Sequence, residues 1–253
     1  MIIEEINILR QHGWQYIPDP QKAEVPAPFR GRPEIQVGIS LDTQLALSDL
    51  CPVEAIGMNP LSIDLGKCYF CGECAMAYPQ AIRFTNDHRL ASNVRQRLIV
   101  AEGDTRGIEL DPDKIRKEIT AMFGRSLKLR QISAAGENSH EAELNACGNV
   151  NFDMGRYGIE FVASPRHADG IVITGPISQN MAEATEICYE AVPDPKIVVL
   201  VGSDAISGGI FAGSGALNRS FLNKVSIDLY VPGNPPHPLT FINGILALSR
   251  SRK

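Results

Sequence analysis

The stretch Ile197-Val198-Val199-Leu200-Val201-Gly202 decides the fold of the larger part of this chain. Its apolar residues follow one another without polar alternation, and a glycine ends the run. This pattern is typical of a strand that is buried on both faces, as in a parallel sheet covered by helices. A second run of the same kind, Ile171-Val172-Ile173, precedes it. The sequence therefore predicts a parallel sheet with helices on both sides.

Strands and helices alternate around this stretch. Strands are predicted at residues 127–132, 159–163, 170–174, 197–202 and 226–231, and helices at 182–192 and 239–250. The alternation predicts a doubly wound α/β domain of the flavodoxin-like kind, with bounds 127–253. Functional loops usually follow the carboxyl ends of such strands. Here these loops are residues 174–176, 202–205 and 232–236.

A cysteine-rich stretch, Cys68-Tyr69-Phe70-Cys71-Gly72-Glu73-Cys74, lies in an earlier part of the chain. Cysteines at intervals of three are typical of iron-sulfur ligation. In two-cluster ferredoxins, the cysteine ahead of a proline in one run serves the cluster of the other run. Cys51-Pro52 supplies that cysteine upstream. We therefore predict one [4Fe-4S] cluster whose iron is bound by Cys51, Cys68, Cys71 and Cys74.

A second cluster in the same lobe is not expected. It would need thiols at Leu41, Gln44, Leu47 and Tyr78, and none of these is a cysteine. Residues 34–92 are thus predicted to form an α+β ferredoxin-like lobe with one cluster. Four thiolates can also form a zinc site. Zinc would leave unexplained why an Ala-Ile pair follows both Pro52 and Pro79, so we favour iron and sulfur.

Two further segments flank this lobe. Residues 1–33 are predicted to form a short amphipathic helix over 2–15 and a proline-rich linker. The apolar stripe of that helix either docks on a partner or covers the core of this chain. Residues 93–126 are predicted to form a connector with a helix over Asp111–Phe123, because a capping Asp is followed by a proline at the first helical position.

The composition excludes several classes of function. The chain has 253 residues and a formal net charge of −5, without a dense run of Lys or Arg, so a nucleic-acid partner is not expected. No apolar stretch is long enough to span a bilayer, and the N-terminus lacks the pattern of a signal peptide. Six cysteines, four of them assigned to one cluster, suit a reducing compartment. We expect a cytoplasmic protein with no direct membrane span.

The α/β part resembles a known family through an ordered series of motifs. These motifs are Gly124-Arg125-Ser126-Leu127, Arg156-Tyr157-Gly158-Ile159, Ser164-Pro165-Arg166-His167-Ala168-Asp169 and Gly208-Gly209-Ile210-Phe211, together with the three loops named above. Over residues 123–248 the chain is similar to the small-subunit family shared by group 4 membrane-bound [NiFe] hydrogenases, formate hydrogenlyase and the B subunit of complex I. The stretch Phe29–Glu34 resembles the neighbouring iron-sulfur subunit, which implies a fusion of two adjacent subunits.

The resemblance also implies that one family site is lost. The family's small subunit carries its own [4Fe-4S] cluster on four cysteines, and at these positions this chain has Glu137, His140, Asp204 and Asn234. Carboxylate and amide oxygens are poorly matched to such a cluster, so we expect it to be absent. One interpretation places a single divalent metal at Glu137, His140 and Asp204. The other is a loop filled by polar residues that bond one another and the backbone.

The function implied by the resemblance is that of an iron-sulfur electron-transfer or assembly subunit. The complex would be related to membrane-bound hydrogenase or NADH-quinone oxidoreductase, with catalysis in a partner. The expected partners are a large subunit of the hydrogenase or complex I type and further membrane-complex subunits, with peripheral attachment at the cytoplasmic face. The alternative is a free-standing ferredoxin-like redox carrier or sensor with a protein-binding α/β domain.

Overall fold

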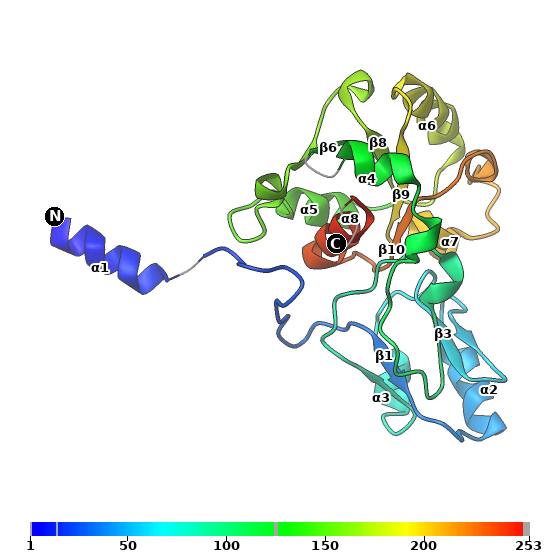
Figure 1. Cartoon of the computed structure of the whole chain (residues 1–253). Coiled ribbons are helices and arrows are strands. Elements are labelled where there is room, and N and C mark those ends of the chain that lie inside the picture. Colours follow the sequence, from blue (N-terminus) through cyan, green and yellow to red (C-terminus); the bar gives the residue numbers. More distant parts are fainter. Residues whose placement is uncertain (1, 14, 124–125, 250–253) are drawn as a thin grey trace.

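The computed structural model describes residues 2–13, 15–123 and 126–249. Trp14 of the first expected helix, Gly124 and Arg125 of the first family motif, and Arg250 of the last expected helix lie outside these ranges, as do the terminal residues Met1 and 251–253. Within them the chain forms a C-terminal α/β part and a smaller N-terminal lobe, with the helix α1 (Ile2–His12) at its beginning (Figure 1).

A five-stranded sheet forms the centre of the C-terminal part in the described residues. Its strands are β6 (Leu127–Ser133), β7 (Ile159–Phe161), β8 (Gly170–Thr174), β9 (Ile197–Val201) and β10 (Leu229–Val231), in the order β10-β9-β8-β6-β7. Every neighbouring pair is parallel. The predicted parallel sheet is confirmed. β10 begins later than expected, since the Asp228 carboxylate, which accepts the Val198 N–H (2.9 Å), takes the place of a strand carbonyl.

Helices cover both faces of this sheet. One face packs on α4 (Lys117–Phe123), α5 (Ser139–Ala146) and α8 (Pro238–Ser249) through a core that contains Val172 and Val199. The opposite face, with Ile173 and Leu200, packs on α6 (Gln179–Ala191) and α7 (Ser203–Ser207). Alternate residues of each strand thus enter different cores, which explains why the strands are apolar throughout. The described arrangement fits the predicted flavodoxin-like domain.

The predicted helix over Asp111–Phe123 is wrong in its first half. Asp111 caps only a short 3-10 turn, Pro112–Lys114, and Ile115 has an extended backbone. The α-helix begins at Lys117 instead. The break lets the Arg116 side chain reach Asp228, where its Nε lies 3.0 Å from Oδ1. An ion pair between distant segments therefore overrides the local helix signal.

The N-terminal lobe combines two small antiparallel sheets with two short helices. Strand β1 (Pro33–Ile35) pairs with β4 (Ile82–Phe84), and β3 (Ser62–Asp64) lies between β2 (Ile56–Gly57) and β5 (Ile99–Ala101). The helices are α2 (Leu41–Leu50) and α3 (Glu73–Ala77). We did not predict α2, although its N-cap Ser40, which accepts the Thr43 N–H (3.3 Å), is a sequence signal for a helix start. Short 3-10 turns lie at 95–98, 154–157, 165–167, 209–211 and 220–223.

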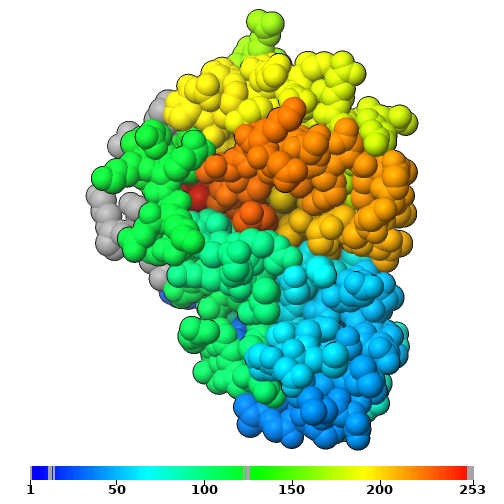
Figure 2. Space-filling view, turned by 90° about the vertical axis from the view of Figure 1, so that its right-hand side faces the viewer, coloured from blue at the N-terminus to red at the C-terminus, as the bar shows by residue number. Residues whose placement is uncertain are grey.

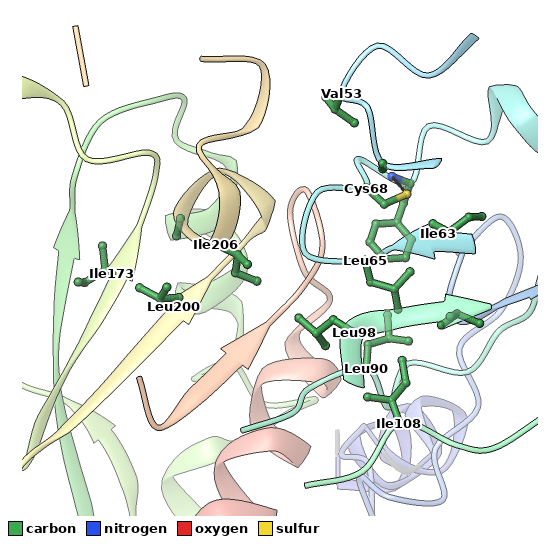
Figure 3. Packing of buried hydrophobic residues seen from close by; sticks show 14 of the residues in the cluster. Val53, Ile63, Leu65, Cys68, Leu90, Leu98, Ile108, Ile173, Leu200 and Ile206 are labelled. Atoms are coloured by element: carbon green, nitrogen blue, oxygen red, sulfur yellow. Dashed lines mark hydrogen bonds between the residues drawn. The ribbon is translucent and has the colours of Figure 1, made fainter. Parts of the chain in front are cut away.

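The lobe and the sheet share one continuous apolar core. Figure 3 shows Leu65, Leu90 and Leu98 of the lobe side in the same buried cluster as Leu200 and Ile206 of the α/β part. In the space-filling view the blue-to-cyan lobe lies directly against the orange segment of the C-terminal part (Figure 2). The two parts are therefore packed together and are not merely linked by the chain.

Helix α1 confirms the first predicted helix but stands away from the body of the molecule (Figure 1). Its apolar side chains are exposed, Ile3 to 74% and Leu9 to 69%. The apolar stripe thus does not cover the core of this chain, which was one of the two expectations. Within the described residues no helix has both the length and the apolar character needed to cross a membrane.

Candidate functional site

Two segments of the N-terminal lobe, Cys51 and the stretch 68–74, bring the four predicted ligand cysteines to one cavity. Cys51 follows α2, Cys68 and Cys71 lie between β3 and α3, and Cys74 lies within α3. All four line the same cavity, and most of its other walls are apolar. Cys68 is buried and Cys71 is exposed, while Cys51 and Cys74 are half-buried. All six cysteines of the chain lie in the described ranges and are free thiols.

Two tight turns direct backbone N–H groups at these sulfur atoms. The Ala55 N–H donates to Cys51 Sγ and the Phe70 N–H donates to Cys68 Sγ, both at 3.3 Å. Phe70 has a φ of +52°, in the left-handed region that residues with a side chain rarely adopt. Hydrogen bonds of this kind stabilise a sulfur atom that carries negative charge. The loop is therefore shaped to support thiolates.

The electrostatics of the cavity indicate what it can hold. Burial is the main cause that raises the pKa of Cys68 to about 12 and that of Cys74 to about 11, and the neighbouring cysteines contribute. Coordination of iron requires the thiolate form. Four thiolates around one apolar cavity repel one another unless a cationic group lies between them. The donor set fits an iron-sulfur core in this respect.

The second predicted metal site does not come together. Among the described residues, no group of three or more His, Cys, Asp or Glu side chains, the four cysteines included, is arranged so that it could hold a metal ion. Glu137 and His140 are paired, with Oε1 3.2 Å from Nδ1. Asp204 is engaged elsewhere and accepts a hydrogen bond from the Tyr69 hydroxyl. Glu137, His140 and Asp204 thus do not form a joint metal site here.

Polar side chains fill this region and mostly bond one another. Glu137 accepts from the Ser139 N–H (2.8 Å) and hydroxyl. Partial burial acts to raise the pKa of Glu137, but these bonds and nearby His140 together lower it. Glu141 accepts from the Thr174 hydroxyl (2.5 Å). His140 is 2% exposed, and its Nε2 has no hydrogen-bond partner in the described part of the chain. The arrangement resembles the polar-filled loop of the second interpretation.

The stretch 68–74, which we call the cysteine loop, makes polar contacts with this region. Tyr69 lies between Cys68 and Cys71, and its hydroxyl donates to Asp204 Oδ1 and accepts from the Ile210 N–H (2.9 Å). Burial and the Asp204 carboxylate raise the pKa of Tyr69 to about 12. The residue before Tyr69 is also held, since the Ser203 hydroxyl donates to the Cys68 carbonyl (2.7 Å). Sequence reasoning missed Tyr69, since no local pattern indicates a partner 135 residues away.

The C-terminal part matches a known family. Residues 138–248 match the family described as NADH ubiquinone oxidoreductase, 20 Kd subunit. The probable membrane-bound hydrogenase subunit mbhJ of Pyrococcus furiosus is 33% identical over 137 residues, which are 54% of this chain and 82% of that protein. The B subunit of NADH-quinone oxidoreductase from Heliobacterium modesticaldum is 43% identical over 107 residues, 42% of this chain and 61% of that protein.

These matches identify the family of the chain. It belongs to the family that contains membrane-bound hydrogenase subunit mbhJ and the B subunit of NADH-quinone oxidoreductase, as the motifs of the α/β part predict. Among solved structures, this chain is similar to a chain of the membrane-bound sulfane sulfur reductase, an archaeal respiratory membrane complex. The match covers 50% of this chain and 70% of that chain, with 29% sequence identity and a TM-score of 0.44.

Proposed function

We propose that this chain is an iron-sulfur electron-transfer subunit that binds one [4Fe-4S] cluster through Cys51, Cys68, Cys71 and Cys74. The observation that carries the proposal is that Cys51 and the separate stretch 68–74 bring these four thiols to one cavity with mostly apolar walls. In this proposal the ferredoxin-like domain spans 34–92, between the N-terminal segment 1–33 and the connector 93–126. Residues 127–253 form the small-subunit domain.

The bound cluster would supply a one-electron redox couple. The protein's own groups would do the rest. The thiolates hold the iron, and the Ala55 and Phe70 N–H groups donate to sulfur, which stabilises the state with more negative charge. Apolar side chains of the cavity, such as Val53 and Ile63, exclude water. Cys71 is the exposed ligand and offers the shortest route for an electron to the surface.

The partners that we propose follow from the relatives. Those proteins are named as subunits of a membrane-bound hydrogenase and of NADH-quinone oxidoreductase. We place this chain in a complex of that kind, beside a large subunit and other membrane-complex subunits, attached peripherally at the cytoplasmic face. Catalysis would then belong to the large subunit. The emptied site at Glu137, His140, Asp204 and Asn234 leaves the lobe cluster as the redox centre of this chain.

The cluster is tested by anaerobic reconstitution with iron and sulfide. We expect about four iron atoms per chain and the visible absorbance of a cubane cluster. The variant Cys68→Ser should lose both, whereas Cys188→Ser, in α6, should retain them. Iron-free protein that holds zinc on the same cysteines, or two clusters per chain, would contradict the proposal.

The assignment to a complex is tested by purification of a tagged chain from its native membranes. Co-purification of a large subunit of the hydrogenase or NADH-quinone oxidoreductase type supports it. Recovery of the chain alone, as a monomer that still carries its cluster, would instead favour the free-standing redox carrier.

A further inference from the structure

The Tyr69 hydroxyl forms specific hydrogen bonds with the α/β domain. This hydroxyl donates to Asp204 and accepts from the Ile210 N–H (2.9 Å). Asp204 is only 4% exposed. A carboxylate at that depth needs strong hydrogen bonds, because burial removes its water. Tyr69 supplies one of them from the other side of the interface.

Gly209 leaves the room that this contact requires. It has a φ of +57°, and a Cβ built on it would overlap both Asp204 Oδ1 and the Tyr69 hydroxyl oxygen. A residue with a side chain at this position would therefore separate the two groups. Gly213, four residues later, has a φ of +80° but nothing within 4 Å of a built Cβ. Both glycines have a positive φ, but only at Gly209 would a Cβ atom collide with neighbouring residues.

The same contact lies beside the sulfur chemistry of the lobe. Tyr69 is flanked by Cys68, whose carbonyl accepts the hydroxyl of fully buried Ser203 (2.7 Å). On its other side, the Phe70 N–H that donates to Cys68 Sγ comes from a residue in a left-handed conformation. Such a conformation persists only where the surroundings enforce it. The α/β domain anchors the Tyr69 hydroxyl and the Cys68 carbonyl, and these two contacts enforce the conformation of Phe70.

We propose that Tyr69 is a positioning residue that locks the cysteine loop onto Asp204 and Ile210 of the α/β domain and thereby sets the reduction potential of the lobe cluster. The effect on the reduction potential rests on the function proposed above. The contact between the cysteine loop and the α/β domain does not depend on that function. Hydrogen bonds to the sulfur atoms raise the potential of such a cluster, because they stabilise its more negative reduced state. Without the contacts of the Tyr69 hydroxyl, the hydrogen bond from the Phe70 N–H to Cys68 Sγ weakens, and the reduction potential of the cluster falls.

The test compares Tyr69→Phe with wild type in two measurements. Hydrogen exchange, followed by mass spectrometry of peptides that contain Ile210, should be at least tenfold faster in the variant. The midpoint potential of the reconstituted cluster should fall by an amount equivalent to about a tenfold change in the reduction equilibrium, about 59 mV for one electron. Tyr78→Phe, in the same lobe, is the matched control and should match wild type in both.

A second pair of variants leaves the cysteine loop unchanged in sequence. Gly209→Ala should reproduce both effects of Tyr69→Phe, and Gly213→Ala should reproduce neither. Unchanged exchange at Ile210, or a cluster potential equal to that of Tyr78→Phe, overturns the proposal. If wild type binds no cluster, the proposed function fails, and exchange at Ile210 in the same preparations still decides the docking contact.

Discussion

At the residue scale, the buried His88 and the half-buried His237 lie where the N-terminal segment meets α8. His88 is 2% exposed, and its Nε2 lies 3.1 Å from the Pro20 carbonyl oxygen and 3.0 Å from the Asn243 side-chain nitrogen. His237 precedes α8, and its Nδ1 accepts the Leu239 N–H (3.2 Å). An acceptor nitrogen cannot carry a proton, so this bond requires the neutral form of His237.

These histidines predict a loss of stability in mild acid. Burial, with a smaller effect from His88, lowers the pKa of His237 to about 4, and burial also lowers the pKa of His88. Between pH 6.5 and pH 4 the unfolded chain therefore binds more protons than the folded one, and stability falls as pH falls. Because His237 is partly exposed to solvent, it accounts for about 1–2 kcal/mol of this loss. Urea denaturation at about pH 7 and about pH 4.5 measures the difference.

The variant His237→Gln should reduce that pH dependence, since the group that resists protonation is gone. His167→Gln, on an exposed turn, is the control and should keep the wild-type slope. A pH dependence that is the same in all three proteins would show that His237 is not responsible.

At the scale of elements, helix α8 packs so closely on its neighbours that one position requires glycine. A Cβ built on Gly244 would lie 2.6 Å from Ala91 Cβ and 3.2 Å from a methyl carbon of Leu229. The helix thus approaches both β10 and the end of the lobe at this point. The lack of space for a side chain, and not helix propensity, therefore requires glycine at position 244.

We predict that Gly244→Ala lowers the free energy of unfolding by about 1–3 kcal/mol, as overpacking of a core does. In an unhindered helix the same change would raise it by up to about 1 kcal/mol. Gly107→Ala, at an exposed position with nothing within 4 Å of the new Cβ, should have little effect. Chemical denaturation of the two variants gives the answer, and a stabilised Gly244→Ala would refute the packing argument.

At the scale of the whole molecule, the lobe and the sheet should unfold as one unit. Their shared core runs from Leu65 and Leu98 to Leu200 and Ile206 (Figure 3). Separation of the two parts would expose this apolar surface to water, which is unfavourable in proportion to its area. The interface also buries the polar contacts of Ser203 and Asp204, which would lose their partners.

The prediction is that peptides from the lobe and from the sheet lose hydrogen-exchange protection at the same denaturant concentration. Ile206→Ala, which changes only the α/β side, should shift both sets of peptides together by about 2–4 kcal/mol. Earlier loss of protection in the lobe alone would mean that the two parts are independent domains.

Much of the fold and of the candidate site could be predicted from the sequence, because both depend on patterns of residues that are close together in the chain. The apolar runs at 170–174 and 197–201 have no polar face, so only a strand between two helix layers satisfies them. The cysteine spacing at 68–74 restricts the possible chemistry, because thiols at such intervals can reach one cluster through a short loop. The ordered motifs of the α/β part identified its family, which the relatives confirm.

Only the tertiary structure decided what lies across the interface. The 3-10 turn before α4 depends on Arg116 reaching Asp228, and the use of Asp204 depends on Tyr69, 135 residues away. Periodicity and capping reflect interactions within a few residues along the chain. Contacts between distant residues arise from the packing of whole elements, and no local pattern records them. The sequence by itself therefore determined the strands of the parallel sheet and the candidate sulfur ligands, and the packing of lobe against sheet determined which polar groups meet.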